Sequence, residues 1–184
     1  MSTMSLRRDH ELIEKVVKSM DTTIKLLEAG KKIPESILLP VIDFSKNFTD
    51  VCHHSKEEKS LFPALERSGM PTQMGPIAMM LMEHEITREI SKKMEESTKV
   101  YFEKGIATDL ISNLKEYVEH VTEHLWKENN RLFMMAEARL QHVAQQVNNE
   151  LNEIENTKLF QIGKTREEYE KIAEEYNKKI TQIS

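Results

Sequence analysis

Apolar positions recur every three or four residues over most of the chain, which is the spacing of one face of an α-helix. Breaker-rich segments ("AGKKIP", "SGMPTQMGP" and "KGIAT") divide this pattern into long stretches. The spacing predicts four helices, over residues 6–29, 34–67, 77–103 and 109 to at least 135. We expect Pro34 to open the second helix and Pro63 to kink it, because proline has no backbone N–H to donate. Four helices with short connections predict an all-α, up-down-up-down four-helix bundle.

A further helical pattern follows this bundle and gives the chain a C-terminal extension. We assign residues 1–137 to the bundle and residues 138–184 to the extension. The motif "IGKT" breaks the extension, and Thr165 with Glu168 has the spacing of a capping box that starts a new helix. One apolar stripe follows along that helix: Tyr169, Ile172, Tyr176, Ile180 and Ile183. The stripe predicts either packing on the bundle or a contact between two copies of the chain in a homodimer.

The composition agrees with a helical protein and argues against some classes of binding partner. Glycine and proline occur only five times each in 184 residues, which favours helices. The net charge of −5, with acidic and basic residues interspersed, argues against nucleic acid and anionic membranes as partners. No apolar stretch has membrane-spanning length, and the N-terminus lacks the apolar region of a signal peptide. A single cysteine, Cys52, excludes an internal disulfide, so we expect a cytoplasmic protein with a buried thiol.

Two fourteen-residue segments of the chain repeat each other. Aligning "HHSKEEKSLFPALE" (residues 53–66) with "HLWKENNRLFMMAE" (residues 124–137) superposes His, Lys, Glu, Leu, Phe and Glu. A second alignment places "DHELI" (residues 9–13) over "EHEIT" (residues 83–87), so that an acid precedes each histidine and a glutamate follows it. By sequence, the chain therefore has two similar halves, each with one single histidine and one H-x-x-x-E motif.

The spacing inside these motifs indicates a metal site. Residues i and i+4 lie one above the other on a helix, so each H-x-x-x-E motif presents an imidazole and a carboxylate together. A lone histidine in an apolar stripe, such as His10, is ordinarily a hydrogen-bonded core residue. The repeated order favours metal ligation instead. The candidate ligands are His10, His53, Glu57, His84, His124 and Glu128.

The ligand types narrow the choice of metal. Imidazoles and carboxylates without thiolates suit iron, zinc or manganese better than magnesium or calcium. Two carboxylates can bridge two ions, which is a common arrangement of paired metals. Ferritin-like di-iron bundles use Glu-x-x-His motifs, and no histidine here has a glutamate three residues before it.

This pattern, with "KEEKSLFP" and "KENNRLF" after the second and fourth histidines, resembles the hemerythrin-like family, also called the HHE cation-binding domain. The resemblance covers residues 6–137. It implies a four-helix bundle around a di-iron centre of two non-heme iron ions, with or without a bridging oxo or hydroxo group. It also implies that Glu57 and Glu128 bridge the ions, that the histidines are terminal ligands, and that O2 or peroxide is the small-molecule ligand.

One position departs from the family pattern. Oxygen-carrying members have a second histidine four residues after the one on the third helix, and here that residue is Arg88. His120, one turn before His124, offers a fifth nitrogen ligand on the fourth helix; its counterpart in the first half is Thr49. The alternative is that His120 packs beside the metal without binding it. We expect Arg88 to form a salt bridge with a neighbouring glutamate.

Other polar residues have milder interpretations. His54 lies about 100° around the helix from His53, so we expect it at the surface, together with His142. Glu58 is expected to pair with a lysine, the alternative being a place beside the metal ligands. Tyr117 is interpreted as a half-buried core residue, the alternative being a hydrogen-bond donor to the site.

Three classes of function fit the predicted site. The first is a binding module for O2 binding, O2 sensing or iron and redox handling. The second is a di-iron enzyme with peroxidase-like, catalase-like or oxidase activity. The third is a structural metal bundle, for instance with zinc, whose surface binds a partner. A sensor usually carries a fused output domain, and only the tail of residues 138–184 is available for one. An enzyme usually has an added acid or base, and only Tyr117 and His120 are candidates. A stand-alone binding or redox role is therefore favoured.

Overall fold

The computed structural model describes residues 2–183, and every regular element in that range is a helix. The all-α prediction is confirmed. Helix α1 spans Met4–Glu28, and a long second run consists of α2 (Glu35–Asp43), the π-helical segments η1 (Phe44–His54) and η2 (Glu57–Leu61), and α3 (Phe62–Arg67). Helix α4 spans Pro76–Lys104, and a second composite run consists of α5 (Thr108–Lys127), π-helical η3 (Glu128–Leu132) and α6 (Phe133–Arg139). A 3-10 turn, η4 (Gln141–Val143), leads to α7 (Ala144–Ile162) and α8 (Arg166–Ile183).

Pro34 and Pro63 lie where the second run begins and where its winding changes. Pro34 is the N-cap of α2 rather than its first helical residue. At Pro63, the run changes its winding directly before the proline, from the π-helical turn η2 to α3. Because Pro63 has no N–H to donate, regular α-helical bonding is interrupted at this point, and a π-helical turn is one way to absorb the interruption.

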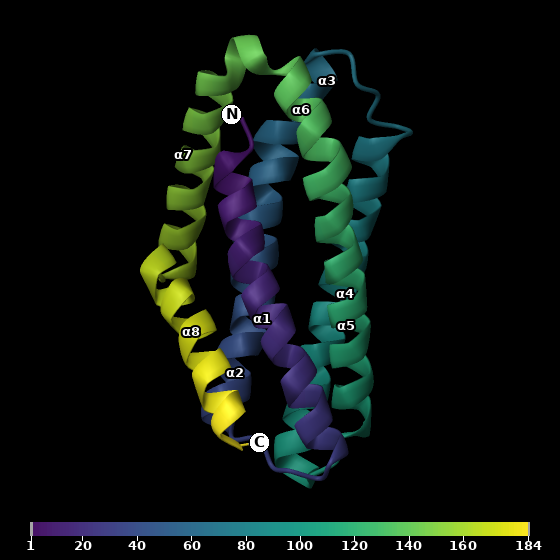
Figure 1. Ribbon diagram of the computed structural model, residues 1–184, viewed down its shortest axis with the longest axis vertical. Coiled ribbons are helices and arrows are strands. Elements are labelled where there is room, and N and C mark those ends of the chain that lie inside the picture. The colour runs from purple at the N-terminus through teal and green to yellow at the C-terminus, as the bar shows by residue number, and fades with distance from the viewer. Residues whose placement is uncertain (1, 184) are drawn as a thin grey trace.

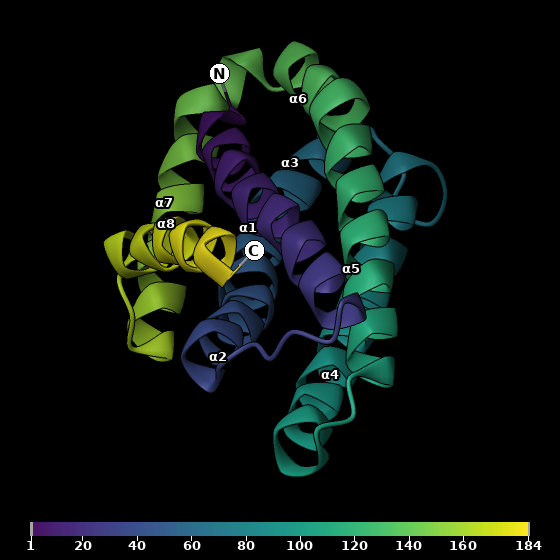
Figure 2. The same ribbon diagram turned by 60° about the horizontal axis from the view of Figure 1, so that its bottom comes forward.

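The long helices run side by side along the long axis of the molecule (Figure 1). Helix α1 packs against α5, α5 packs against α4, and α4 packs against α2 and η1. Helix α7 lies along η1 and η2, and α8 lies along α1 and α2 (Figure 2). No helix within residues 2–183 combines the length and the apolar composition that a membrane span requires.

The extension uses its apolar stripe inside the chain. Tyr169, Tyr176 and Ile180 are buried, and Ile172 and Ile183 pack partly buried against the same core. The predicted capping box is confirmed, because Thr165 N–H donates to Glu168 Oε2 (2.7 Å) and Glu168 N–H donates to Thr165 Oγ1 (3.2 Å). Gly163 ends α7 in the left-handed conformation (φ 77°), which glycine adopts without strain. The homodimer stays a prediction.

Two apolar clusters fill the interior, with a polar layer between them. On α1, Leu6 belongs to one cluster and Ile13 to the other, and His10 lies between them. On the α5 to α6 run, Leu125 and Leu132 are divided between the clusters in the same way. The sequence therefore interrupts a continuous core with ionisable groups at one level of the molecule.

A first prediction tests the docking of α8. Ile180 is fully buried in the core cluster, so Ile180→Ala removes apolar contacts and leaves a cavity. We expect a loss of about 2–5 kcal/mol in the free energy of unfolding, measured by denaturant titration. Phe160→Ala is the control, because the Phe160 side chain is 88% exposed. An unchanged unfolding midpoint in Ile180→Ala would mean that α8 is not docked in solution.

Candidate metal centre

The polar layer consists of four histidines and two glutamates that no solvent reaches. Each of these six residues is at most 1% exposed. Each of the four helical runs contributes at least one of them: His10 from α1, His53 from η1, Glu57 from η2, His84 from α4, His124 from α5 and Glu128 from η3. The structure therefore brings together six of the seven predicted ligands.

The six groups form two overlapping sets that could each hold an ion. His10 and His53 with Glu57 and Glu128 form one set, and His84 and His124 with the same two glutamates form the other. Within each set, one ligand atom from every residue lies within 4.8 Å of the others. The two carboxylates are common to both sets, which is the arrangement that bridging ligands require.

The distances show how each glutamate faces both halves. Glu57 Oε2 lies 3.7 Å from His53 Nε2 and 3.3 Å from His84 Nε2. Glu128 Oε2 lies 3.2 Å from His10 Nε2 and 3.4 Å from His124 Nε2. All four imidazoles thus direct Nε2 toward the carboxylates.

The outer nitrogens of the H-x-x-x-E histidines are held by matching acids. His53 Nδ1–H donates to Asp9 Oδ2 (3.2 Å), and His124 Nδ1–H donates to Glu83 Oε2 (2.9 Å). Asp9 and Glu83 are the two acids that precede the single histidines in the repeat. A carboxylate on Nδ1 fixes the tautomer and leaves the Nε2 lone pair for a metal.

The single histidines are held in a similar but unequal way. His10 Nδ1–H donates to the amide oxygen of Asn129 (2.9 Å), whereas His84 Nδ1–H donates to the carboxylate of Glu58 (2.8 Å). Asn129 and Glu58 occupy equivalent positions, each directly after one of the two glutamates that are common to both sets. Glu58 therefore supports a histidine, which is the alternative that we had set out, and its ion pair is with Arg88 instead of the expected lysine.

The repeated Leu-Phe pairs belong to the apolar cluster on one side of this layer and cover it there. The Phe133 ring stacks on His10 with centroids 5.0 Å apart, and the Phe62 ring stacks on His84 at 5.7 Å. Each phenylalanine thus covers the single histidine of the opposite half. This contact explains why the polar "HHSKEEKS" segment is followed by an apolar "LF" pair.

Both H-x-x-x-E motifs meet π-helical turns. Glu57 opens η2 and Glu128 opens η3, and the same five-residue length recurs in both halves. π-Helical turns are rare and concentrate at functional sites, where the wider turn re-aims side chains. The sequence periodicity gave no sign of them, because the apolar spacing is compatible with either winding.

The donor atoms leave a place that suits a cation. Both oxygens of Glu57 and of Glu128 are buried without a hydrogen bond, and so are Nε2 of His84 and of His124. In addition, His10 Nε2 and His53 Nε2 face each other at 3.2 Å. Because both Nδ1 atoms point their protons outward, two lone pairs would meet unless a proton or a cation lies between them. Unpaired buried donors and acceptors of this kind are costly, and a metal ion satisfies them together.

The electrostatics lead to the same conclusion. Burial alone would lower the pKa of His84, but the neighbouring carboxylates of Glu128, Glu57 and Glu58 raise it well above its usual range. Burial would raise the pKa of Glu128, yet the nearby imidazoles of His124, His10 and His84 hold the pKa well below its usual range. The carboxylates thus favour positive charge in this layer, and metal ions can replace the imidazole protons that otherwise supply it.

His54 is not at the surface, which corrects our expectation. Its side chain is 1% exposed, its ring stacks on His84 with centroids 3.8 Å apart, and Nδ1–H donates to Asp50 Oδ1 (3.2 Å). His54, His84 and His124 form a further group whose nitrogen atoms lie within 4.8 Å of one another. The expectation failed because η1 has packed neighbours on several sides, so that a residue 100° from His53 faces α4 instead of solvent.

His120, our predicted fifth ligand, lies outside all of these groups. Its Nε2 is 3.0 Å from the carbonyl oxygen of Glu83 and 3.1 Å from Thr87 Oγ1, both on α4. The structure thus gives His120 the packing role that we had set out as the alternative. Arg88 forms ion pairs with Asp50, Glu58 and Glu85, which confirms its expected salt bridge. Asp50 and Glu58 are also the acids that accept from His54 and His84, so Arg88 lies next to the supports of these histidines.

The match to known families agrees with this geometry. Residues 4–136 match the model of the hemerythrin HHE cation binding domain. The chain belongs to this family. Comparison with curated proteins and with solved structures finds no match. The match over residues 4–136 confirms the family resemblance that the motifs predicted.

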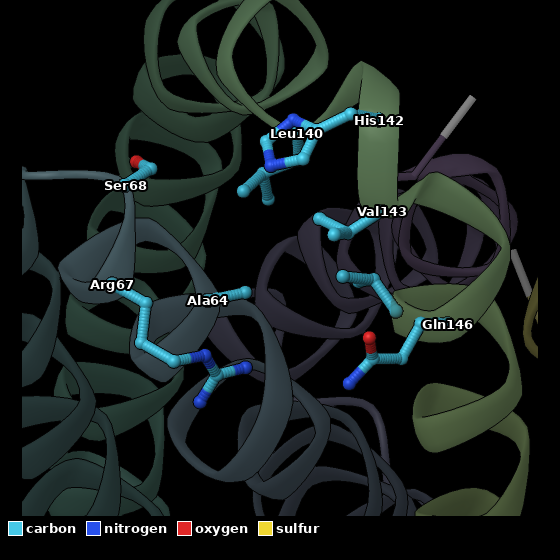
Figure 3. Close-up of a pocket in the computed structure, with 8 residues that line it drawn as sticks. Ala64, Arg67, Ser68, Leu140, His142, Val143 and Gln146 are labelled. Carbon is cyan, nitrogen blue, oxygen red and sulfur yellow. The ribbon is translucent and has the colours of Figure 1, made fainter.

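The HHE domain contains all six candidate ligands, whereas α7 and α8 lie beyond the matched residues. A surface pocket of about 230 Å³ lies where the domain meets this extension, between α3, η4 and α7 (Figure 3). Arg67 and His142 are among its lining residues, and it shares none with the ligand sets. His142 is exposed, as predicted.

A second prediction concerns Cys52, which precedes His53. The thiol is fully buried, and burial raises its pKa to about 12. We expect no reaction of the folded protein with an aromatic disulfide reagent at about pH 8, and one thiol per chain after unfolding in guanidinium. Rapid labelling of the folded chain would show that the layer around His53 opens to solvent.

Proposed function

We propose that this HHE domain holds a non-heme di-iron centre and binds O2 there. The observation that carries the proposal is the pair of overlapping ligand sets that share Glu57 and Glu128. Two sets with common carboxylates suit two ions bridged by those carboxylates better than one isolated ion. In this account, the four runs that carry the ligands form an up-down-up-down four-helix bundle, and α7 and α8 are added to it.

The ligand types and the family support iron. Imidazole and carboxylate groups suit iron, and no thiolate belongs to any of the three ligand groups. We assign His10 and His53 to one ion, and His84 and His124 to the other. His54 joins the second set as a third imidazole, in place of His120. Its counterpart in the repeat is Leu125, so the second ion has more nitrogen ligands than the first.

Burial of the ligands favours a small gaseous ligand over a larger substrate. Because the six groups are at most 1% exposed, a bulky molecule could not approach them without displacing a helix. When bound, a ferrous pair supplies electrons that O2 accepts. The residues of the chain fix the imidazoles through Asp9, Glu83, Glu58 and Asn129, and Phe62 and Phe133 keep bulk water away.

Metal analysis combined with an optical spectrum tests the proposal. The chain is loaded with ferrous iron without air, and its spectrum is recorded before and after exposure to O2. We expect about two irons per chain and a charge-transfer band that appears with O2 and disappears when O2 is removed. One zinc per chain and no spectral change would contradict the proposal.

A third prediction concerns the shared carboxylates. Glu57→Ala or Glu128→Ala should lower the iron content from two ions to one or none, because each carboxylate serves both sets. Glu66→Ala is the control, since Glu66 lies on the same run and is exposed. Two irons retained in both single variants would rule out the bridging assignment.

A fourth prediction separates His54 from His120. Leucine has similar bulk to histidine and cannot bind a metal, so His54→Leu should keep the iron but shift the charge-transfer band and speed autoxidation. His120→Leu should leave the band and the lifetime of the O2 complex unchanged, because its nitrogen is already bonded to α4. The opposite pattern would return the fifth-ligand role to His120.

A further inference from the structure

A buried network of charges joins the C-terminal extension to the imidazole of His53. Asp9 Oδ2 accepts from His53 Nδ1–H and from Lys56 Nζ (2.6 Å), while Asp9 Oδ1 accepts from Arg166 Nη1 (2.7 Å). Glu155 closes a ring of four alternating charges, since Oε2 accepts from Lys56 (2.6 Å) and Oε1 from Arg166 (3.1 Å). Every charge in the ring therefore has two opposite neighbours.

The ring is deeply enclosed. Asp9 and Lys56 are fully buried, and Glu155 and Arg166 are 7% and 9% exposed. Charges this far from water are costly unless they are well paired, and removal of one member leaves another uncompensated. Asp9 consequently has little freedom to turn away from His53 while both extension residues are present.

The second half of the site has the same inner contacts and lacks the outer ones. His124 Nδ1–H donates to Glu83, which accepts from Lys127 (2.6 Å), as Asp9 accepts from Lys56. Here the lysine has Glu123 as its other partner (2.8 Å), and the Glu123 side chain is 66% exposed. The Lys127 side chain itself is 23% exposed. The chain of contacts behind His124 thus ends at an exposed glutamate, whereas the chain of contacts behind His53 ends at buried residues of α7 and α8.

Glu155 and Arg166 both lie beyond residues 4–136, the part that matches the HHE domain. We propose that they are positioning residues of the metal centre. They hold Asp9 in place, and Asp9 holds the imidazole of His53 through its hydrogen bond. The ion at His10 and His53 therefore exchanges more slowly than the ion at His84 and His124. This inference rests on the proposed di-iron function. Groups that orient a metal-binding histidine commonly change metal affinity by about 10- to 100-fold.

A purely structural role would predict something different. The extension is also docked by apolar residues and by an ion pair between Lys164 Nζ and Asp43 Oδ2 (2.9 Å), which does not involve Asp9. If Arg166 only docked α8, loss of Lys164 would have the same effect on the metal centre. Lys164→Met is therefore the matched control for Arg166→Met.

The experiment measures release of ferrous iron from the full-length protein, without air, to an excess of a coloured ferrous chelator. Wild type should release its two ions in two phases of equal amplitude. Arg166→Met should speed the slow phase about 10-fold or more and leave the fast phase unchanged. Lys127→Met should speed only the fast phase, and Lys164→Met neither. Arg166→Lys, which keeps the charge, should restore part of the slow release.

A second variant guards against a folding defect in Arg166→Met. Glu155→Gln keeps the shape of the side chain and leaves Asp9 paired with Lys56 and Arg166. Like Arg166→Met, it should speed the slow phase of iron release. Release of both ions in one phase from wild type, or equal effects of Arg166→Met and Lys164→Met, would overturn the inference and leave the di-iron function standing. A wild-type chain that binds no iron would instead overturn the proposed function, and this inference with it.

Discussion

The rest of the structure depends on the cost of burying four imidazoles and two carboxylates at one level of a helical interior. Ionisable groups in such a place must be paired, hydrogen-bonded or metal-bound. The chain meets this constraint on the outer side of the layer, where every Nδ1 has an acid or amide acceptor. On the inner side, the carboxylate oxygens have no protein partner. A layer that is satisfied outside and unsatisfied inside is what a cation site requires.

Pseudo-symmetry explains how a simple repeat builds this layer, and its exceptions make the two ligand sets differ. Asp9 with Lys56 repeats as Glu83 with Lys127, and the Phe pairs repeat as well. The repeat fails at His54, which corresponds to Leu125, and at Glu58, which corresponds to Asn129. These exceptions place one more imidazole and one more carboxylate beside His84 and His124, whereas the buried charges of the extension lie behind His53.

Sequence periodicity predicted the helices and the motif order predicted the six inner groups, because a helix fixes which residues share a face. The surface assignment of His54 was wrong because it relied on angles within one helix, whereas packing against α4 decides the environment of this residue. His120 likewise contacts α4, at the carbonyl oxygen of Glu83, which its position on one helix could not show. The π-helical turns left no trace in the apolar pattern. The link from Arg166 to Asp9 spans 157 residues and depends on how α8 packs, so local spacing could not show it.

Two ions that share Glu57 and Glu128 can be located in a crystal structure of the iron-loaded protein, with data collected at the iron absorption edge. We expect two anomalous peaks about 3.5–4 Å apart, one beside His10 and His53 and the other beside His84 and His124, with the two carboxylates between them. A single peak, or two peaks without a common carboxylate, would mean that the glutamates do not bridge a pair of ions.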